Sequence, residues 1–112
     1  MSAVRLVREL VLEARRTEPD GAGGYRESWV PLGLHWAEVV AGSGRDIPGE
    51  EVTLSSVPYR ITVRAYPVGS DGRPVPEQRF REGTRIFRII AVAERDRAGR
   101  YLLCFAREEV PA

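Results

Sequence analysis

The side chains that most often carry out catalysis or bind metals are scarce in this sequence, which holds one histidine, His35, and one cysteine, Cys104. One residue of each type cannot complete a zinc site, and a single cysteine cannot form an internal disulfide. Both residues lie between apolar neighbours in strand-like segments. We therefore expect His35 to be a structural or surface histidine and Cys104 to be a small buried hydrophobe.

Other common catalytic patterns are also missing. Every basic residue is an arginine, and the absence of lysine excludes a P-loop lysine and a Schiff base. Ser43 lies in a Gly-Ser-Gly sequence but lacks the strand and helix that flank a nucleophile elbow. Residues 21–24 are glycine-rich, but no helical pattern follows them, which favours a hairpin loop over a phosphate-binding loop. We expect a protein that is not an enzyme and that needs no cofactor or metal.

Charge could still act locally, although the net charge is only +1. The most basic stretch interleaves arginine with phenylalanine: Arg79, Phe80, Arg81, Arg85, Phe87 and Arg88. One interpretation is a small barrel that binds single-stranded nucleic acid, with arginines on phosphates and aromatic rings on bases. The other is a set of solvated or interface arginines balanced by Glu77 and Glu82. The near-neutral chain favours the second interpretation.

The length of 112 residues and the hydrophobic share of 43% predict a single domain spanning residues 1–112. The longest apolar stretches, such as residues 89–93, fall far short of the roughly 18 to 20 residues that a membrane-spanning helix needs. The first residues lack the uninterrupted apolar run of a secretory signal. We expect a cytoplasmic protein without a membrane partner.

Short apolar segments separated by turn signals predict an all-β fold. Residues 60–66 alternate between apolar and polar side chains, as a half-buried strand does. Residues 84–92 are apolar on both faces except at Arg85 and Arg88, and residues 101–106 are apolar throughout, which indicates two central strands. The turn at residues 96–99 would join them as a hairpin.

The first segment, residues 4–14, fits both a helical and a strand-like spacing. We favour a strand, because the glycine-rich loop that follows suits a hairpin to residues 25–30. The next strand runs on to residue 40 and is expected to bend or bulge around Pro31 and Gly33. The sum is a small antiparallel β-barrel of about six strands, with a long loop between the second and third strands.

The sequence also predicts which large side chains are buried and where the chain is irregular. The predicted structural core includes Trp29, Trp36, Phe87 and Cys104, with a subunit interface as another place for the two tryptophans. Residues 41–58 form the longest segment without periodicity, and loops of this length in a compact domain are usually functional or disordered. Residues 67–76, rich in proline and glycine, are expected to form a stiff surface excursion.

The order of several short motifs resembles the phage head–tail joining family, also called head-closure or stopper proteins, in the version carried by phage-like gene transfer agents of GC-rich bacteria. The matching stretches span nearly the whole chain: residues 6–13, 20–29, 35–39, 42–45, 59–64, 83–89 and 101–104. Each motif is weak alone, and the collinear set carries the resemblance.

This resemblance implies a small β-barrel that assembles as a ring, a hexamer or a dodecamer, beneath the portal-side adaptor ring. Such a ring closes the channel on the packaged DNA and offers a docking surface to a tail terminator or tail tube protein. Assembly in the bacterial cytoplasm would precede a final place at the head–tail junction. In the family the loop corresponding to residues 41–57 faces the ring axis, which implies these channel or gating residues: Gly42, Ser43, Gly44, Arg45, Asp46, Glu50 and Glu51. We assign Arg79, Arg81 and Arg85 to contacts between subunits or with the adaptor.

Overall fold

The computed structural model describes residues 3–42 and 54–109, which form an all-β protein. Its strands are β1 (Arg8–Pro19), β2 (Tyr25–Ala41), β3 (Leu54–Arg64), β4 (Arg79–Glu82), β5 (Arg85–Glu94) and β6 (Tyr101–Glu109). Within these two ranges the chain contains no helix, and hence none that could cross a membrane.

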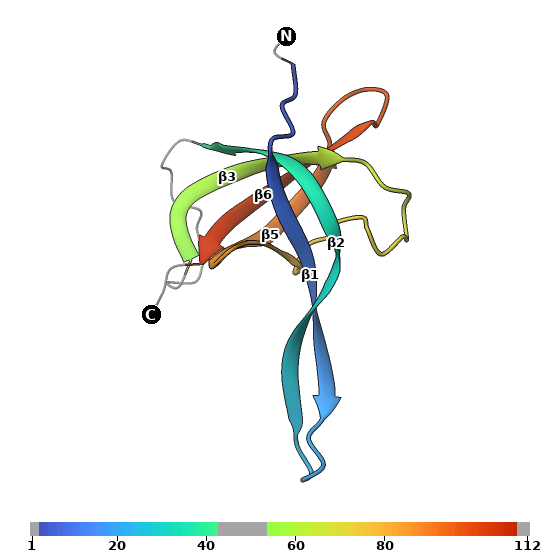
Figure 1. Ribbon diagram of the computed structural model, residues 1–112, viewed down its shortest axis with the longest axis vertical. Coiled ribbons are helices and arrows are strands. Elements are labelled where there is room, and N and C mark those ends of the chain that lie inside the picture. The colour runs from blue at the N-terminus through green and yellow to red at the C-terminus, as the bar shows by residue number, and fades with distance from the viewer. Residues whose placement is uncertain (1–2, 43–53, 110–112) are drawn as a thin grey trace.

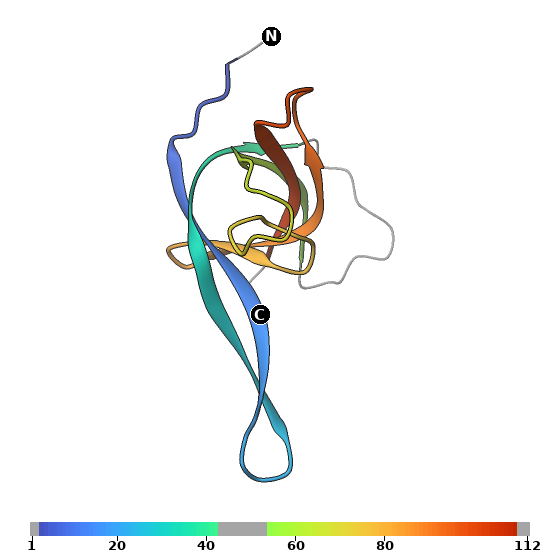
Figure 2. The ribbon, with the colours of Figure 1, turned by 90° about the vertical axis from the view of Figure 1, so that its right-hand side faces the viewer.

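The strands form one antiparallel sheet that closes on itself in the order β1-β2-β3-β6-β5-β4 (Figures 1 and 2). The pairing of β4 with β1 closes the ring, and it involves only residues 11–13 of β1 and 79–81 of β4. The strands differ greatly in length, so the closed sheet is uneven. It confirms the predicted small antiparallel barrel of about six strands, including a strand in the first segment.

The hairpin of β1 and β2 extends well beyond the closed part of the sheet. β1 pairs with β2 along its whole length, but β2 pairs with β3 only at residues 37–41. Residues 14–30 therefore have only each other as sheet neighbours and project as a twisted ribbon, which we call the arm (Figures 1 and 2). The arm accounts for a long axis of 55 Å in a molecule whose other dimensions are 31 and 24 Å.

The glycine-rich sequence forms the turn at the end of the arm. The Asp20 carboxylate accepts hydrogen bonds from the backbone N–H groups of Ala22 and Gly24 at 2.8 and 3.0 Å. Gly21 and Gly23 have φ angles of +80° and +86°, which side chains with a Cβ rarely adopt. The segment is thus a hairpin loop, as its sequence predicts.

A bulge bends β2 where the arm leaves the barrel. Leu12 pairs with Gly33 and Glu13 pairs with Pro31, so Leu32 is an extra residue on β2. Pro31 is tolerated here because β2 has no neighbouring strand on its other side at this point. The structure therefore shows the bend expected around Pro31 and Gly33.

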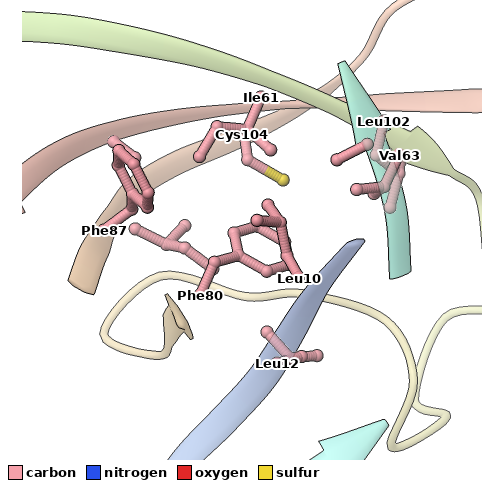
Figure 3. Close-up of a cluster of buried hydrophobic side chains, with 11 residues drawn as sticks. Leu10, Leu12, Ile61, Val63, Phe80, Phe87, Leu102 and Cys104 are labelled. Carbon is pink, nitrogen blue, oxygen red and sulfur yellow. The ribbon is translucent and has the colours of Figure 1, made fainter. Parts of the chain in front are cut away.

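The core fills the inside of the closed sheet with side chains from all six strands (Figure 3). Its buried members are Leu10, Leu12, Ala37, Ile61, Val63, Phe80, Phe87, Ile89, Leu102, Cys104 and Ala106. Two of the four predicted core residues, Phe87 and Cys104, belong to it, and Trp29 is half-buried at the base of the arm. Trp36 is 52% exposed, so its predicted core position is corrected. It faces outward because its neighbours His35 and Ala37 face inward.

The connection between the second and third strands in the sequence joins Ala41 of β2 to Leu54 of β3. Of the predicted gating residues, only Gly42 lies within the described part of the chain, and its N–H donates to the Pro58 carbonyl at 2.7 Å. The remaining six lie outside the described residues: Ser43, Gly44, Arg45, Asp46, Glu50 and Glu51.

Candidate interaction surfaces

The first arginines of the basic cluster bind a buried carboxylate at the closing seam between β4 and β1. Phe80 of β4 faces the core, so Arg79 and Arg81 on either side of it face outward. Their Nε atoms donate to the two carboxylate oxygens of Glu13 at 2.8 and 2.9 Å. Burial alone would raise the pKa of Glu13, but hydrogen bonds from Arg81 and Arg79 outweigh it and lower the pKa below its ordinary value. Glu13 is thus a charged link across the seam.

A second set of ion pairs runs across one end of the barrel. Arg85 of β5 binds Glu108 of β6 through two hydrogen bonds of 2.8 and 3.0 Å. Arg8 of β1 binds Glu82 of β4 in the same two-pronged manner, at 2.9 and 2.5 Å. Hydrogen bonds from these arginines lower the pKa of Glu108 and of Glu82. Both carboxylates therefore stay ionised at neutral pH.

These contacts change the interpretation of the arginine and phenylalanine cluster. Phe80 and Phe87 are fully buried and cannot stack on bases. Each arginine of the cluster pairs with a carboxylate of its own chain, including Arg88 with Glu109 at 3.5 Å. The cluster holds strands together, and its charge is largely compensated within the chain. It therefore lacks the exposed aromatic rings of a single-strand-binding surface.

The outward side of β2, β3 and β6 has a different character, which sequence reasoning did not single out. We call it the outer face, and its exposed members are Leu34, Trp36, Val40, Arg60, Arg64 and Phe105. The register places Val40 opposite Arg60, and Arg60 opposite Phe105. No carboxylate among the described residues pairs with Arg60 or Arg64. The signal was present in the sequence, because the outward positions of residues 34–40 are mainly apolar.

A shallow depression of about 120 Å³ lies on the outer face. Its lining residues are Leu34, His35, Trp36, Arg64 and Tyr66. The His35 ring packs edge-on against Tyr66 and Phe80, with ring centres 5.0 and 5.9 Å away. Burial lowers the pKa of His35, and a hydrogen bond with the Gly72 backbone opposes this effect only in part. The imidazole is therefore neutral at pH 7 and packs as an aromatic ring.

The other candidate chemical group is equally buried. Cys104 lies in the core, and burial raises the pKa of its thiol to about 12. The thiol is thus protonated at neutral pH, which suits the small hydrophobe expected at this position. In the described ranges, His, Cys, Asp and Glu side chains form no cluster that could hold a metal ion.

A small closed sheet with a projecting arm and an apolar, arginine-bearing outer face has the features of a protein that acts by contact with other proteins. Similarity to known proteins agrees with a protein that acts by contact with other proteins. A family model described as phage head completion protein matches residues 1–109, so the chain belongs to that family.

A solved structure extends the comparison. The chain is 62% identical to a chain from a structure titled as the virion of a native gene transfer agent particle, with 100% of both chains covered and a TM-score of 0.78. No curated protein matches the sequence. The resemblance to head–tail joining proteins of gene transfer agents is confirmed, and the chain is a virion structural protein with a role in joining head and tail.

Proposed function

We propose that the chain is the stopper of a phage or gene transfer agent particle, a ring that lies below the portal and adaptor and closes the DNA channel after packaging. The family match over residues 1–109 carries this proposal, and the 62% identity to a chain of a gene transfer agent virion supports it. The ring, a hexamer or a dodecamer, assembles in the bacterial cytoplasm. In the particle it presents the docking surface for a tail terminator or tail tube protein, and its role is structural rather than catalytic.

In this proposal the gate is the connection between β2 and β3, at residues 41–57. Its two ends are held by the barrel, since Gly42 is hydrogen-bonded to Pro58 and Leu54 of β3 pairs with Glu109 of β6. A loop anchored at both ends can act on the channel while the barrel stays unchanged. The sequence of residues 41–57 contains Arg45 and Asp46 and also Glu50 and Glu51, so the charge of this segment is not uniformly attractive to DNA.

The arginines near the closing seam and at the barrel end have N–H groups that remain available to bind another subunit or the adaptor ring. Arg81 and Arg85 are each about two-fifths exposed, and Arg81 uses only its Nε in the contact with Glu13. A guanidinium has five N–H donors, so one carboxylate of the same chain does not exhaust it. We include Arg79, Arg81 and Arg85 in the proposed contacts with another subunit or with the adaptor.

The test is to delete the gene, image the particles by electron microscopy and measure protected DNA after nuclease treatment. We expect tailless heads that have lost their DNA, and recovery of tailed, DNA-filled particles when the gene is supplied in trans. Tailed particles with protected DNA in the deletion strain would overturn the proposal.

A second variant separates closure from joining. Residues 43–53 are replaced by a flexible Gly-Ser linker of equal length, which leaves the anchored ends in place. A stopper loop predicts that this variant still enters particles but protects less DNA than the unchanged protein. Full protection of the DNA would show that these residues do not form the gate, while the role in joining head and tail would stand.

A further inference from the structure

We propose that the tip of the arm of one copy docks on the outer face of the next copy, and that this contact closes the ring. The inference rests on the proposed ring and names the two surfaces that form it. The donor surface is the arm tip, residues 17–25. The acceptor surface is the outer face around Trp36, Arg60 and Arg64.

The arm tip is acidic and carries an exposed aromatic ring. Residues 17–25 include Glu18 and Asp20 and contain no arginine, while Arg26, the cross-strand partner of Glu18, lies just outside the tip. Backbone hydrogen bonds from Ala22 and Gly24 lower the pKa of Asp20, so the tip remains negatively charged. Tyr25 is 74% exposed, and tyrosine, which combines an apolar ring with a polar hydroxyl, is enriched at protein interfaces.

The outer face offers the complementary groups. Arg60 and Arg64 have no ion-pair partner on the described parts of the chain, and exposed Trp36 lines the same depression as Arg64. On this side of the sheet three arginines, Arg60, Arg64 and Arg95, outnumber two carboxylates: Glu38, which Arg95 binds at 3.4 Å, and the exposed Glu9 of β1, which lies opposite Trp36. The face therefore presents net positive charge together with apolar surface. Trp, Tyr and Arg side chains are the ones that contribute most to binding at protein interfaces.

The depression next to Trp36 provides a place for the ring of Tyr25. Its walls include Leu34, Tyr66 and the Arg64 side chain, and its volume of about 120 Å³ suits part of an aromatic side chain. The carboxylates of the tip would then lie within reach of the arginines of the outer face. Acidic groups on one surface and unpaired arginines on the other give the contact both attraction and orientation.

The two surfaces of one chain cannot meet each other. The arm is paired from its base to its tip and points away from the closed sheet, with its tip at one end of the long axis (Figure 1). The outer face lies on the closed sheet itself. The contact must therefore join different copies, and a contact between two unlike surfaces of identical subunits closes into a ring when the rotation from one copy to the next allows it.

A charge swap in the particle tests the pairing. Glu18→Arg and Arg64→Glu are introduced singly and together in a strain that lacks the native gene. We expect each single variant to enter particles at least tenfold less than the unchanged protein, and the double variant to recover most of the loss. Arg97→Glu, a reversal at an exposed turn residue of the β5 and β6 hairpin, is the matched control and should assemble normally.

Disulfide cross-linking gives a readout that does not depend on charge. Tyr25→Cys combined with Leu34→Cys should produce a ladder of covalent multimers from oxidised particles on a non-reducing gel, and neither single variant should do so. Particles that contain the double variant without a ladder would overturn the docking proposal and leave the stopper function intact. Tailed, DNA-filled particles formed without any copy of the protein would instead reject the stopper function itself.

Discussion

The Arg79 guanidinium lies 4.0 Å from the centre of the Trp29 ring. The same guanidinium donates through Nε to Glu13 at 2.8 Å. A side chain of β4 thus joins the base of the arm, which carries Trp29, to the seam that closes the barrel. A two-stranded ribbon is only marginally stable on its own, so the direction of the arm depends on contacts of this kind at its base.

Glu13→Gln should weaken the closed sheet more than any substitution of an exposed carboxylate. The change leaves two arginines without the charge that they share, and Arg79 is largely buried. We expect a loss of about 2 to 3 kcal/mol in the free energy of unfolding, somewhat below the cost of breaking a fully buried pair. Urea denaturation measures it. Glu27→Gln is the control, because its ion pair with Arg15 is exposed and should be worth less than about 0.5 kcal/mol. Equal losses would show that burial of Glu13 contributes nothing.

Acid should begin to destabilise the fold through His35. Its pKa is lowered by burial, so the unfolded chain, with the ordinary value of 6.5, binds the proton more readily. The stability that depends on the neutral ring is complete above pH 6.5 and is lost as the pH falls from 6.5 towards the lower folded pKa. Glu13, Glu82 and Glu108 have lowered pKa values and stay ionised in that window. Unfolding free energies at about pH 8 and about pH 5.5 should differ for the native chain and differ less for His35→Gln.

Gly83→Ala should destabilise the β4 and β5 hairpin. Glu82 pairs with Arg85, so Gly83 is the first of the two turn residues, and its φ of +61° is the left-handed conformation that such a turn needs. We expect a loss of about 1 kcal/mol in the free energy of unfolding. Gly33→Ala is the matched control, because Gly33 lacks a positive φ and a Cβ there meets nothing within 4 Å. Thermal unfolding of both variants provides the comparison, and an equal shift in Tm would contradict the turn argument.

The acidic residues of the proposed gate should speed the departure of DNA. Glu50→Gln together with Glu51→Gln removes two negative charges from the loop and reduces its repulsion of the DNA phosphates. We expect slower DNA release from triggered particles and an unchanged amount of the protein per particle. Release followed by dye fluorescence, with immunoblotting for incorporation, measures both quantities. Unchanged release kinetics would count against a repulsive role for these two carboxylates.

Much of the fold could be predicted because strand pattern and turn chemistry are local. The alternation at residues 60–66 and the glycines at residues 21–24 depend on near neighbours in the sequence, and the structure shows a strand that runs to Arg64 and a hairpin turn at the glycines. The bend of β2 could also be predicted, because the backbone nitrogen of Pro31 cannot donate a hydrogen bond to a neighbouring strand. These features follow from backbone geometry and need no knowledge of distant contacts.

The interaction surfaces were harder to predict because they depend on pairing between distant strands. Arg79 and Glu13 are far apart in sequence, and only the closure of β4 on β1 shows that the arginine is already engaged. The residue type of Trp36 predicts burial in the core or at a subunit interface. The register shows that it shares the outward side of β2 with Leu34 and Val40. A large apolar residue can face solvent when a partner later covers it, and residue type does not reveal that partner.

The edge of β2 that has no strand beside it affects how the protein behaves before assembly. Residues 25–36 pair only with β1, so their other edge is available for hydrogen bonds to a strand of any chain. Such an edge favours aggregation when subunits accumulate in the cell. The proline and the extra residue at positions 31 and 32 interrupt that edge near its middle, which prevents a long continuous ladder from forming. The same bulge that bends β2 at the base of the arm therefore also limits edge-to-edge pairing with other chains.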